Sequence, residues 1–504
     1  MAANDQLPII VGTGQATWRE PDLERTPVDA LEQAARLALQ DAGGGVEAAI
    51  DAVVNVRFIA DTNPEVGALF PRNPGAAIAT RLGLGRPALY LGAIGGNTPQ
   101  YLVNRCAEKL LTEQHRAILL TGAELMATFF NALRNAGDLS LWAGAGQQEP
   151  ATIGTERDGL TMQETLHGLY EPINTYPLFE NALRHRLGRS VQNHIEVISQ
   201  LSSNLSAVAA QNPLAWRRDP LTAEEIATVG PGNRYIGYPY TRAMNAVLEV
   251  DMSAAIVLTT VGRARELGIP QEKWIYLRGG VDVNDIWYPG ERANWHSSPA
   301  IELGWQQLSA ASGLGLDDLS HFDIYSCFPS AVEIACDALG LPLSDARGVT
   351  VTGGLPFFGG PGNNYSLHAI AEMAARLQRD GRGSGLVTAN GLYLTKHSLG
   401  LYSTEAGEPV LTDGTALQAQ VDAGPRVAMA SAAAGEATVE TWTVAFGRQG
   451  PERGIVIARN DAGERIIANS DSSEETLRAM IAQDPIGERG RVRVDGDINR
   501  FEFE

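Results

Sequence analysis

Residues 88–128 read ALYLGAIGGNTPQYLVNRCAEKLLTEQHRAILLTGAELMAT, and this stretch decides the fold class. The short apolar runs at 88–91 and 117–121 are typical of buried strands. Between them, Thr98-Pro99 gives a helix-start signal, because Thr is a good cap and Pro suits the first turn. The apolar residues that follow recur at helical spacing: Leu102, Val103, Cys106, Ala107 and Leu110. The order strand, helix, strand predicts a parallel sheet with helices packed on it.

The same alternation precedes and follows this stretch. Residues 8–14 predict another buried strand, and Thr26-Pro27 opens a helix that we expect to run through Ala42. A second series of strands and helices occupies residues 254–390. Two successive blocks of similar style predict an α/β protein with an internally duplicated fold.

The sequence has a different texture after about residue 404. Residues 454–459 and 464–469 predict two strands of a hairpin, because Asn-Asp-Ala-Gly lies between them. Ser472 with Glu475 is a capping-box signature for one short helix. We therefore expect a separate, mostly β domain, a small barrel. The expected units are an N-terminal half at 1–125 with 245–270, a loop domain at 126–244, a C-terminal half at 271–404 and the β domain at 405–504.

The composition excludes several classes of protein. The 504 residues hold 39 Lys and Arg against 59 Asp and Glu, a net charge of −20, which disfavours binding to nucleic acids or anionic membranes. Three cysteines without a CxxC spacing predict neither a disulfide framework nor a cysteine metal site, and they fit a reducing compartment. We find no signal-peptide pattern at the start and no apolar run of about 18 residues. We expect a cytoplasmic protein without a metal, a membrane or a nucleic-acid partner.

Several segments, in this order along the chain, resemble thiolases of the sterol-carrier-protein type. Residues 88–128 are similar to the nucleophile-bearing helix and the strand after it. DIYSCF at 323–328 resembles the His-Asp-Cys-Phe loop of the family, and GGLPFFGGPGNNY at 353–365 resembles its Gly-His-Pro loop. LVTANG at 386–391 stands where the family has its last catalytic loop, and residues 405–504 are similar to the domain appended in thiolase-like protein type 1 sequences. The resemblance implies duplicated βαβαβαββ halves in a layered α-β-α-β-α arrangement, followed by an OB-like barrel.

The catalytic groups of a thiolase are missing at the matching positions. Gly96 stands where the family has its nucleophilic cysteine, Tyr325 and Gly360 replace the two loop histidines, and Ala389 replaces the final cysteine base. Nucleophile and base act as a unit, so their joint loss predicts no Claisen chemistry. Cys106 lies about two turns into the helix on its apolar side, and we expect it to be a core residue.

The same loops carry new polar side chains. The candidate catalytic residues are Tyr325, Ser326, Cys327, Tyr365, Asn390 and His397. Some thiolase relatives cleave 3-hydroxyacyl-CoA by a retro-aldol reaction and use tyrosines in place of the lost groups, and Tyr325 resembles that substitution. A tyrosine base needs its pKa lowered from about 10, for instance by the nearby Lys396.

The region that is similar to the thiolase loop domain contains several arginines. In an otherwise acidic chain these side chains would attract the phosphates of CoA, although they could equally form a solvated face. Backbone N–H groups of the glycine-rich loops could bind a thioester oxygen. The candidate CoA-binding residues are Arg184, Arg186, Arg217, Arg218, Gly96 and Gly360. We expect CoA or acyl-CoA as a substrate or ligand rather than a tightly bound cofactor, and a monomer or a homodimer.

Two functions remain open at this point. One is an enzyme of the acetyl-CoA acetyltransferase class that acts on CoA thioesters without a covalent intermediate, by retro-aldol or similar C–C cleavage. The other is a non-catalytic protein or scaffold that binds CoA thioesters. A single pocket that receives Tyr325, Tyr365, Asn390 and His397 would favour the enzyme, and scattered side chains would favour binding alone.

Overall fold

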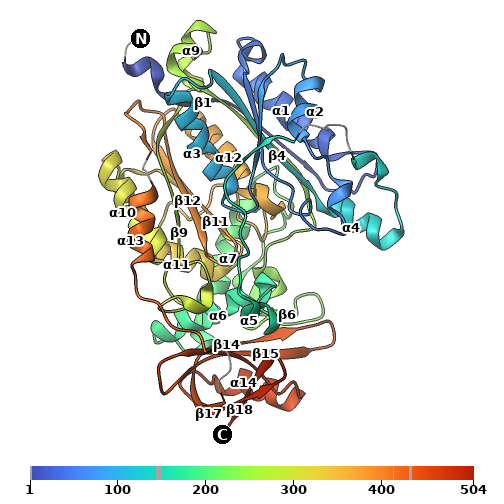
Figure 1. The fold of residues 1–504 in the computed structure, drawn as a ribbon. Helices are drawn as coiled ribbons and strands as arrows, with labels where there is room; N and C mark the ends of the chain where they lie inside the picture. Colours follow the sequence, from blue (N-terminus) through green and yellow to red (C-terminus); the bar gives the residue numbers. More distant parts are fainter. Residues whose placement is uncertain (1–2, 144–148, 412–413, 431–433) are drawn as a thin grey trace.

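One mixed sheet of 11 strands runs through both halves of the core in the computed structural model (Figure 1). The structure describes residues 3–143, 149–411, 414–430 and 434–504. Ten strands follow the order β10-β11-β12-β9-β1-β8-β4-β2-β3-β5, and β13 pairs with β9 beside this path. Their bounds are β1 (Pro8–Trp18), β2 (Ala52–Asn55), β3 (Ala88–Gly92), β4 (Ala117–Leu125), β5 (Ala151–Ile153), β8 (Asp251–Thr260), β9 (Ile275–Asn284), β10 (His321–Asp323), β11 (Ser384–Gly391), β12 (Lys396–Ser403) and β13 (Val410–Leu411).

The two halves of this sheet meet at one corner. Strand β1 pairs with β8 along most of its length, but it pairs with β9 only at Ile9 and Ile10. Two central helices, α3 (Thr98–Leu111) and α12 (Tyr365–Asp380), pack against each other and against strands of both halves. The predicted duplicated, layered α/β fold is confirmed.

The remaining core helices cover the outer faces of the two halves. They are α1 (Pro27–Ala42), α2 (Pro74–Arg81), α4 (Met126–Asn135) and α9 (Val261–Glu266) in the first half, and α10 (Pro299–Ser312), α11 (Pro329–Leu339) and α13 (Gly414–Asp422) in the second. The predicted start of α1 is confirmed, since Thr26 caps it through a capping box with Asp29. At α3 the prediction was wrong by one residue, because Thr98 is the first helical residue and its hydroxyl donates to Ala93 O instead of capping.

The residues between the two halves form a layer between the core and the C-terminal domain (Figure 1). This layer contains α5 (Met162–Leu166), α6 (Pro172–Arg186), α7 (Val191–Gln211), α8 (Ala223–Ala227), β6 (Tyr235–Gly237) and β7 (Tyr240–Thr241). Helix α6 packs on β14, and β6 pairs with β14 where Gly237 faces Ala445. The layer is therefore joined to the C-terminal domain by a shared sheet.

The C-terminal domain is a closed five-stranded barrel. It consists of β14 (Gly435–Phe446), β15 (Pro451–Asn460), β16 (Arg465–Ser470), β17 (Arg489–Asp495), β18 (Ile498–Phe503) and α14 (Glu474–Gln483). The barrel closes because β14 pairs with both β15 and β17. The predicted hairpin is confirmed as β15 and β16. The helix cap is Ser473 rather than Ser472, because α14 begins one residue later than the motif suggested.

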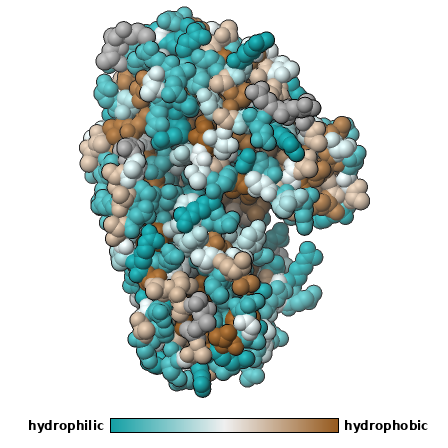
Figure 2. Space-filling view, in the orientation of Figure 1, coloured by the Kyte–Doolittle hydropathy of each residue, from teal (hydrophilic) through white to brown (hydrophobic). Residues whose placement is uncertain are grey.

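Two elements, β13 and α13, pack on the core before the barrel begins. Strand β13 pairs in parallel with β9, and α13 packs on β9 and α10. Figure 2 shows a mainly hydrophilic surface, as a net charge of −20 leads one to expect. No helix among the described residues is long and apolar enough to cross a membrane.

Candidate functional site

Gly96 lies in the turn between β3 and α3, at the position matched to the thiolase nucleophile. A Cβ atom on this residue would lie 2.1 Å from Tyr325 Oη and 2.5 Å from Asn390 O. Both distances are far below van der Waals contact, so the turn accepts only glycine here. The tyrosine hydroxyl therefore occupies the space that a nucleophilic side chain at position 96 would need.

Tyr325 follows β10 and is almost fully buried. Its backbone N–H donates to Thr388 Oγ1 at 3.0 Å, and its ring stands edge-on to Tyr365 with centroids 5.5 Å apart. Burial, and then the neighbouring Cys327, raise the pKa of Tyr325 far above its ordinary value. The phenol therefore stays protonated, and it can donate a hydrogen bond but is a poor base.

Tyr365 and Ser326 are committed to the backbone framework of the glycine-rich loop. Tyr365 is the first residue of α12, and its hydroxyl lies 2.9 Å from Asp323 Oδ1 and 2.7 Å from Thr352 Oγ1. Ser326 Oγ accepts from the N–H of Leu355 at 3.2 Å. These contacts fix residues 352–355 on the end of β10.

Asn390 and Cys327 belong to a second buried group, around Tyr176. Asn390 donates to Tyr176 Oη at 2.9 Å, and its Nδ2 lies 3.9 Å from Cys327 Sγ. Tyr176 stacks on Phe328 with ring centroids 4.4 Å apart. Burial raises the pKa of Cys327 to about 12, so this thiol is not poised for nucleophilic attack. Cys106 is a core residue, as predicted, with its pKa likewise raised to about 12 by burial.

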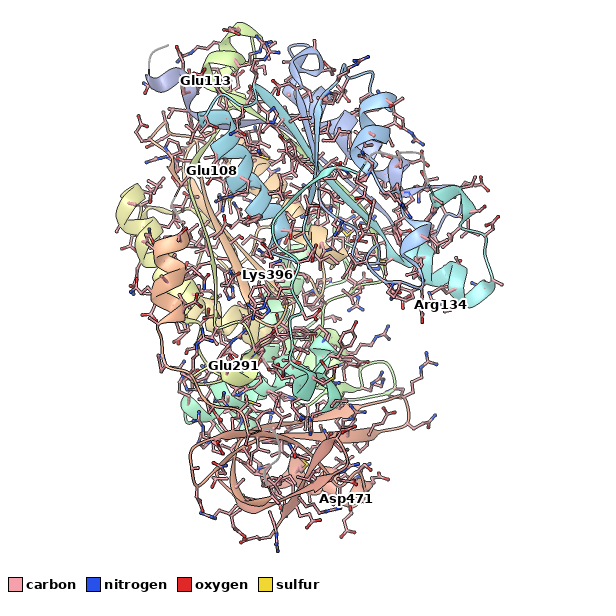
Figure 3. All side chains as sticks on the ribbon, in the orientation of Figure 1. Glu108, Glu113, Arg134, Glu291, Lys396 and Asp471 are labelled. Atoms are coloured by element: carbon pink, nitrogen blue, oxygen red, sulfur yellow. The ribbon has the colours of Figure 1, made fainter. Side chains whose placement is uncertain are left out.

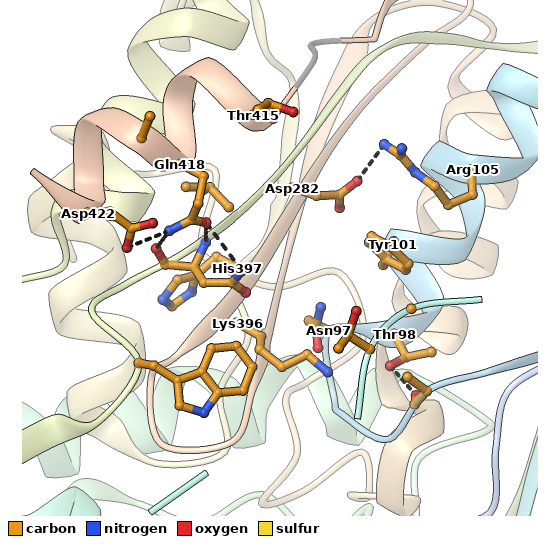
Figure 4. A pocket seen from close by; sticks show the side chains of 18 residues that line it. Asn97, Thr98, Tyr101, Arg105, Asp282, Lys396, His397, Thr415, Gln418 and Asp422 are labelled. Atoms are coloured by element: carbon orange, nitrogen blue, oxygen red, sulfur yellow. Dashed lines mark hydrogen bonds and ion pairs between the residues drawn. The ribbon is translucent and has the colours of Figure 1, made fainter. Parts of the chain in front are cut away.

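A cavity of about 650 Å³ lies beside the start of α3 (Figure 4). One wall is the face of α3 that carries Asn97, Tyr101 and Arg105, and β9 and β12 contribute further lining. The opposite wall is α13, where Gln418 accepts from Asn284 N–H at 2.8 Å and donates to Asn284 O at 2.9 Å. The segment that follows the second half of the core therefore completes this cavity.

Of the predicted catalytic residues, His397 contributes to the lining of this cavity. Its Nε2 lies 3.0 Å from Asp285 Oδ2, and Asp285 also accepts from Ser298 Oγ at 2.5 Å. Burial alone would raise the pKa of Asp285, but the hydrogen bond and charge of His397, with nearby Arg292, bring it below its ordinary value. The imidazole is thus held by a buried hydrogen bond to Asp285 at the start of α10.

Sequence reasoning missed most of the cavity lining. Tyr101 and Arg105 follow Asn97 at intervals of four residues, and Asp282 and Asn284 alternate along β9. These spacings place polar side chains on one helix face and one strand face, and they are the signal that could have indicated the site. Tyr365, Asn390 and His397 make their contacts in three different surroundings, so the four candidate residues do not converge in one pocket.

Two of the four candidate CoA-binding arginines have protein partners. Arg184 is buried, and its Nη2 lies 2.6 Å from Asp484 Oδ2, so it fastens α6 to the barrel. Arg186 forms an ion pair with Asp337 at 2.8 Å. Both side chains therefore make contacts within the protein, and Arg186 is exposed.

Arg217 and Arg218 lie apart from that pair. Arg218 is exposed and Arg217 is partly buried, and burial followed by Arg242 lowers the pKa of Arg217. The backbone N–H of Gly360 donates to Val247 O at 2.8 Å, so this amide is not available to a thioester oxygen.

A second buried polar cluster contains Glu180, His194 and Glu333. His194 Nε2 lies 2.6 Å from Glu180 Oε1 and 3.7 Å from Glu333 Oε2. Arg189 Nη1, which can only donate, lies 3.2 Å from His194 Nδ1 and 2.9 Å from Glu333 Oε1. His194 Nδ1 must accept, so Nε2 carries the proton and donates to Glu180. This tautomer leaves no lone pair on Nε2 for a metal. The cluster is therefore a buried hydrogen-bond network of titratable side chains.

Comparison with known proteins gives the following likenesses. Residues 416–497 match the family described as the thiolase-like protein type 1 additional C-terminal domain. A monomeric SCP2-thiolase like protein type 1 from Mycobacterium smegmatis is 34% identical, with 100% of both chains covered and a TM-score of 0.84.

Two more distant proteins share parts of the chain. The 3-ketoacyl-CoA thiolase of Salmonella heidelberg (strain SL476) is 29% identical over 164 residues, which are 29% of this chain and 35% of that protein, so the chain matches about a third of its length. The structure titled Ltp2-ChsH2(DUF35) aldolase is 20% identical, with 80% of this chain and 99% of that chain covered and a TM-score of 0.59. The second likeness is one of fold alone.

Proposed function

The chain belongs to the family of thiolase-like proteins of type 1, and from this premise we propose that it binds an acyl thioester, such as acyl-CoA, without forming a covalent acyl-enzyme. The observation that carries the proposal is the occupation of the nucleophile's space at Gly96 by the Tyr325 hydroxyl. A side chain at position 96 is excluded sterically. The thiol of Cys327 is buried with a raised pKa, so it offers no replacement nucleophile.

A thioester-binding role uses features that the fold retains. The start of α3 faces a cavity of about 650 Å³, which is within the usual range for small-molecule sites. Arg217 and Arg218 take part in no salt bridge with any of the residues that the structure describes, which leaves them able to bind phosphate groups of CoA. Arg184 and Arg186 are withdrawn from this role because of their ion pairs.

A second candidate function is retro-aldol cleavage of a 3-hydroxyacyl thioester. The observation in its favour is the position of the Tyr325 hydroxyl beside Gly96, the residue matched to the thiolase nucleophile. Because the phenol remains protonated, its role would be to donate a hydrogen bond to the enolate oxygen, and another group would remove the hydroxyl proton. Under this alternative Tyr325→Phe lowers turnover by roughly 10²–10³, the usual effect of losing one such donor.

Titration and intact-mass measurement on the full chain test the proposal together. We expect acetyl-CoA to bind with an affinity that falls as salt rises, and we expect no acetyl group on the protein after incubation. Arg217→Ala with Arg218→Ala weakens binding, whereas the control Arg134→Ala, an exposed arginine on α4, leaves it unchanged. Stoichiometric acetylation would refute the noncovalent role. Absence of binding would refute the thioester ligand, and turnover of a 3-hydroxyacyl-CoA would establish the second function.

A further inference from the structure

Lysine is rare in this chain, and one of its lysines lies in the cavity. Of the 39 Lys and Arg residues, lysine occurs only at positions 109, 273 and 396. Lys109 lies over the Tyr90 ring and Lys273 pairs with Asp41. Lys396 lines the cavity beside α3, and Figure 3 shows it near the centre of the molecule. Lysine can lose its proton in a protein, whereas arginine cannot. Position 396 therefore carries a lysine amine that can become a nucleophile, where an arginine could not.

The Lys396 amine lies against the turn that leads into α3. Its Nζ donates to Ile94 O at 2.7 Å, and a Cβ on Gly95 would lie 3.0 Å from it. Figure 4 shows the side chain directed toward Asn97 at the helix start. The amine therefore faces the positive end of a 14-residue helix, which disfavours the ammonium form.

The residues that the structure describes place no carboxylate at salt-bridge distance from this amine. The charge of Glu156 acts on the Lys396 amine. Its carboxylate, however, accepts hydrogen bonds from Arg57 at 3.2 Å and from Ile94 N–H at 2.9 Å. Among the residues that the structure describes, none forms a salt bridge with Lys396. Burial lowers the pKa of Lys396 against the opposing charge of Glu156. Its position at the helix start and its burial both favour the neutral amine.

The surroundings of the amine fit a carbonyl compound. Asn97 is 4% exposed, and its Oδ1 has no hydrogen-bond partner among the described residues. This oxygen is packed against the backbone of Gly95 and Gly391, beside the Lys396 amine. Tyr101 and Trp287 supply aromatic surface to the same cavity, which suits an apolar ligand body.

We propose that Lys396 captures an aldehyde or ketone in this cavity as an imine. The amine nitrogen attacks the carbonyl carbon, a C–N bond forms, and the carbonyl oxygen takes up the proton that the nitrogen releases. The C–O bond then breaks, water leaves and the C=N bond forms, so one amine and one carbonyl give one imine and one water. This step requires no thioester and is independent of the proposed function.

Reductive trapping on the full-length protein tests the proposal. Near neutral pH, limiting propanal with sodium cyanoborohydride converts each imine to a stable propylamine, and peptide mass mapping quantifies the product at the three lysines. The neutral amine is the form that attacks a carbonyl, and burial favours that form at Lys396, so we expect alkylation of Lys396 to be faster than that of Lys109 and Lys273. Equal or slower alkylation of Lys396 would overturn the proposal.

Two variants separate imine formation from attraction of an anion. Lys396→Arg keeps a basic side chain but removes the amine, so it should abolish the cavity adduct, while the matched Lys273→Arg should leave it intact. Excess propanoate, a carboxylate of the same size that cannot form an imine, tests whether the site attracts anions instead of capturing a carbonyl. We expect it to leave trapping nearly unchanged, and strong protection of Lys396 by propanoate would show an anion site instead and would contradict the proposal. The comparison of the three lysines in the parent protein stands even where a variant fails to fold.

Discussion

Replacing Gly96 by alanine tests whether the tyrosine hydroxyl fills the former nucleophile space. The new methyl carbon would lie 2.1 Å from Tyr325 Oη, 2.8 Å from Tyr325 Cζ and 2.5 Å from Asn390 O. Overpacking of this kind costs about 1–3 kcal/mol. We expect a loss near the upper end, about 3 kcal/mol, because the contact with a backbone oxygen cannot be relieved by rotating a side chain.

A double-mutant cycle assigns the share of this cost that belongs to the hydroxyl. Tyr325→Phe removes the atom in the 2.1 Å contact and keeps the ring, so Gly96→Ala should cost about 1 kcal/mol less in that background. Urea unfolding of the four proteins measures this coupling. The control is Gly85→Ala, whose added carbon meets nothing within 4 Å and whose cost should stay within about 0.5 kcal/mol. Additivity of the two substitutions within about 0.3 kcal/mol would refute the placement of Tyr325 against Gly96.

Three further predictions follow from buried groups. Burial raises the pKa of Glu333 to about 8 and lowers that of His194 to about 4. The folded Glu333 keeps a proton that the unfolded chain has lost, whereas His194 affects stability only below its unfolded pKa of about 6.5. Stability should therefore fall between about pH 6.5 and 8, by up to about 1.4 kcal/mol per unit, and Glu333→Gln should flatten that slope in urea unfolding. Arg184→Ala should destabilise the protein by roughly 2–4 kcal/mol, because it breaks a largely buried ion pair with the barrel. The control Arg186→Ala breaks a half-exposed ion pair and should cost less than about 1 kcal/mol. Thermal unfolding measures both changes. With a pKa of about 12, Cys327 should react with a thiol reagent at pH 8 only after unfolding, and rapid labelling of the native protein would show that this pocket is open.

The sequence alone determined the parts of the structure that depend on neighbouring residues. The start of α1 at Thr26-Pro27, the succession of strand, helix and strand around α3, and the β15–β16 hairpin all rest on signals a few residues long. Such signals fix dihedral angles and periodic burial locally. Two similar blocks of them predicted the duplicated α/β fold, and the hairpin signal after residue 404 predicted the separate barrel. The sequence also singled out Gly96 and Tyr325 as departures from a thiolase.

Only the tertiary structure decided what these residues can do. Gly96 and Tyr325 are far apart in the chain, yet the Tyr325 hydroxyl fills the space beside Gly96. Burial raises the pKa of Tyr325, so the residue predicted to act as a base stays a protonated phenol. Arg184 forms an ion pair with Asp484, which is 300 residues away in the sequence. Helix α13 forms a wall of a cavity that is also lined by α3, which begins at residue 98. Burial, pKa and cavity shape are sums over groups that the fold brings together from distant segments, and a local pattern carries no information about which groups those will be.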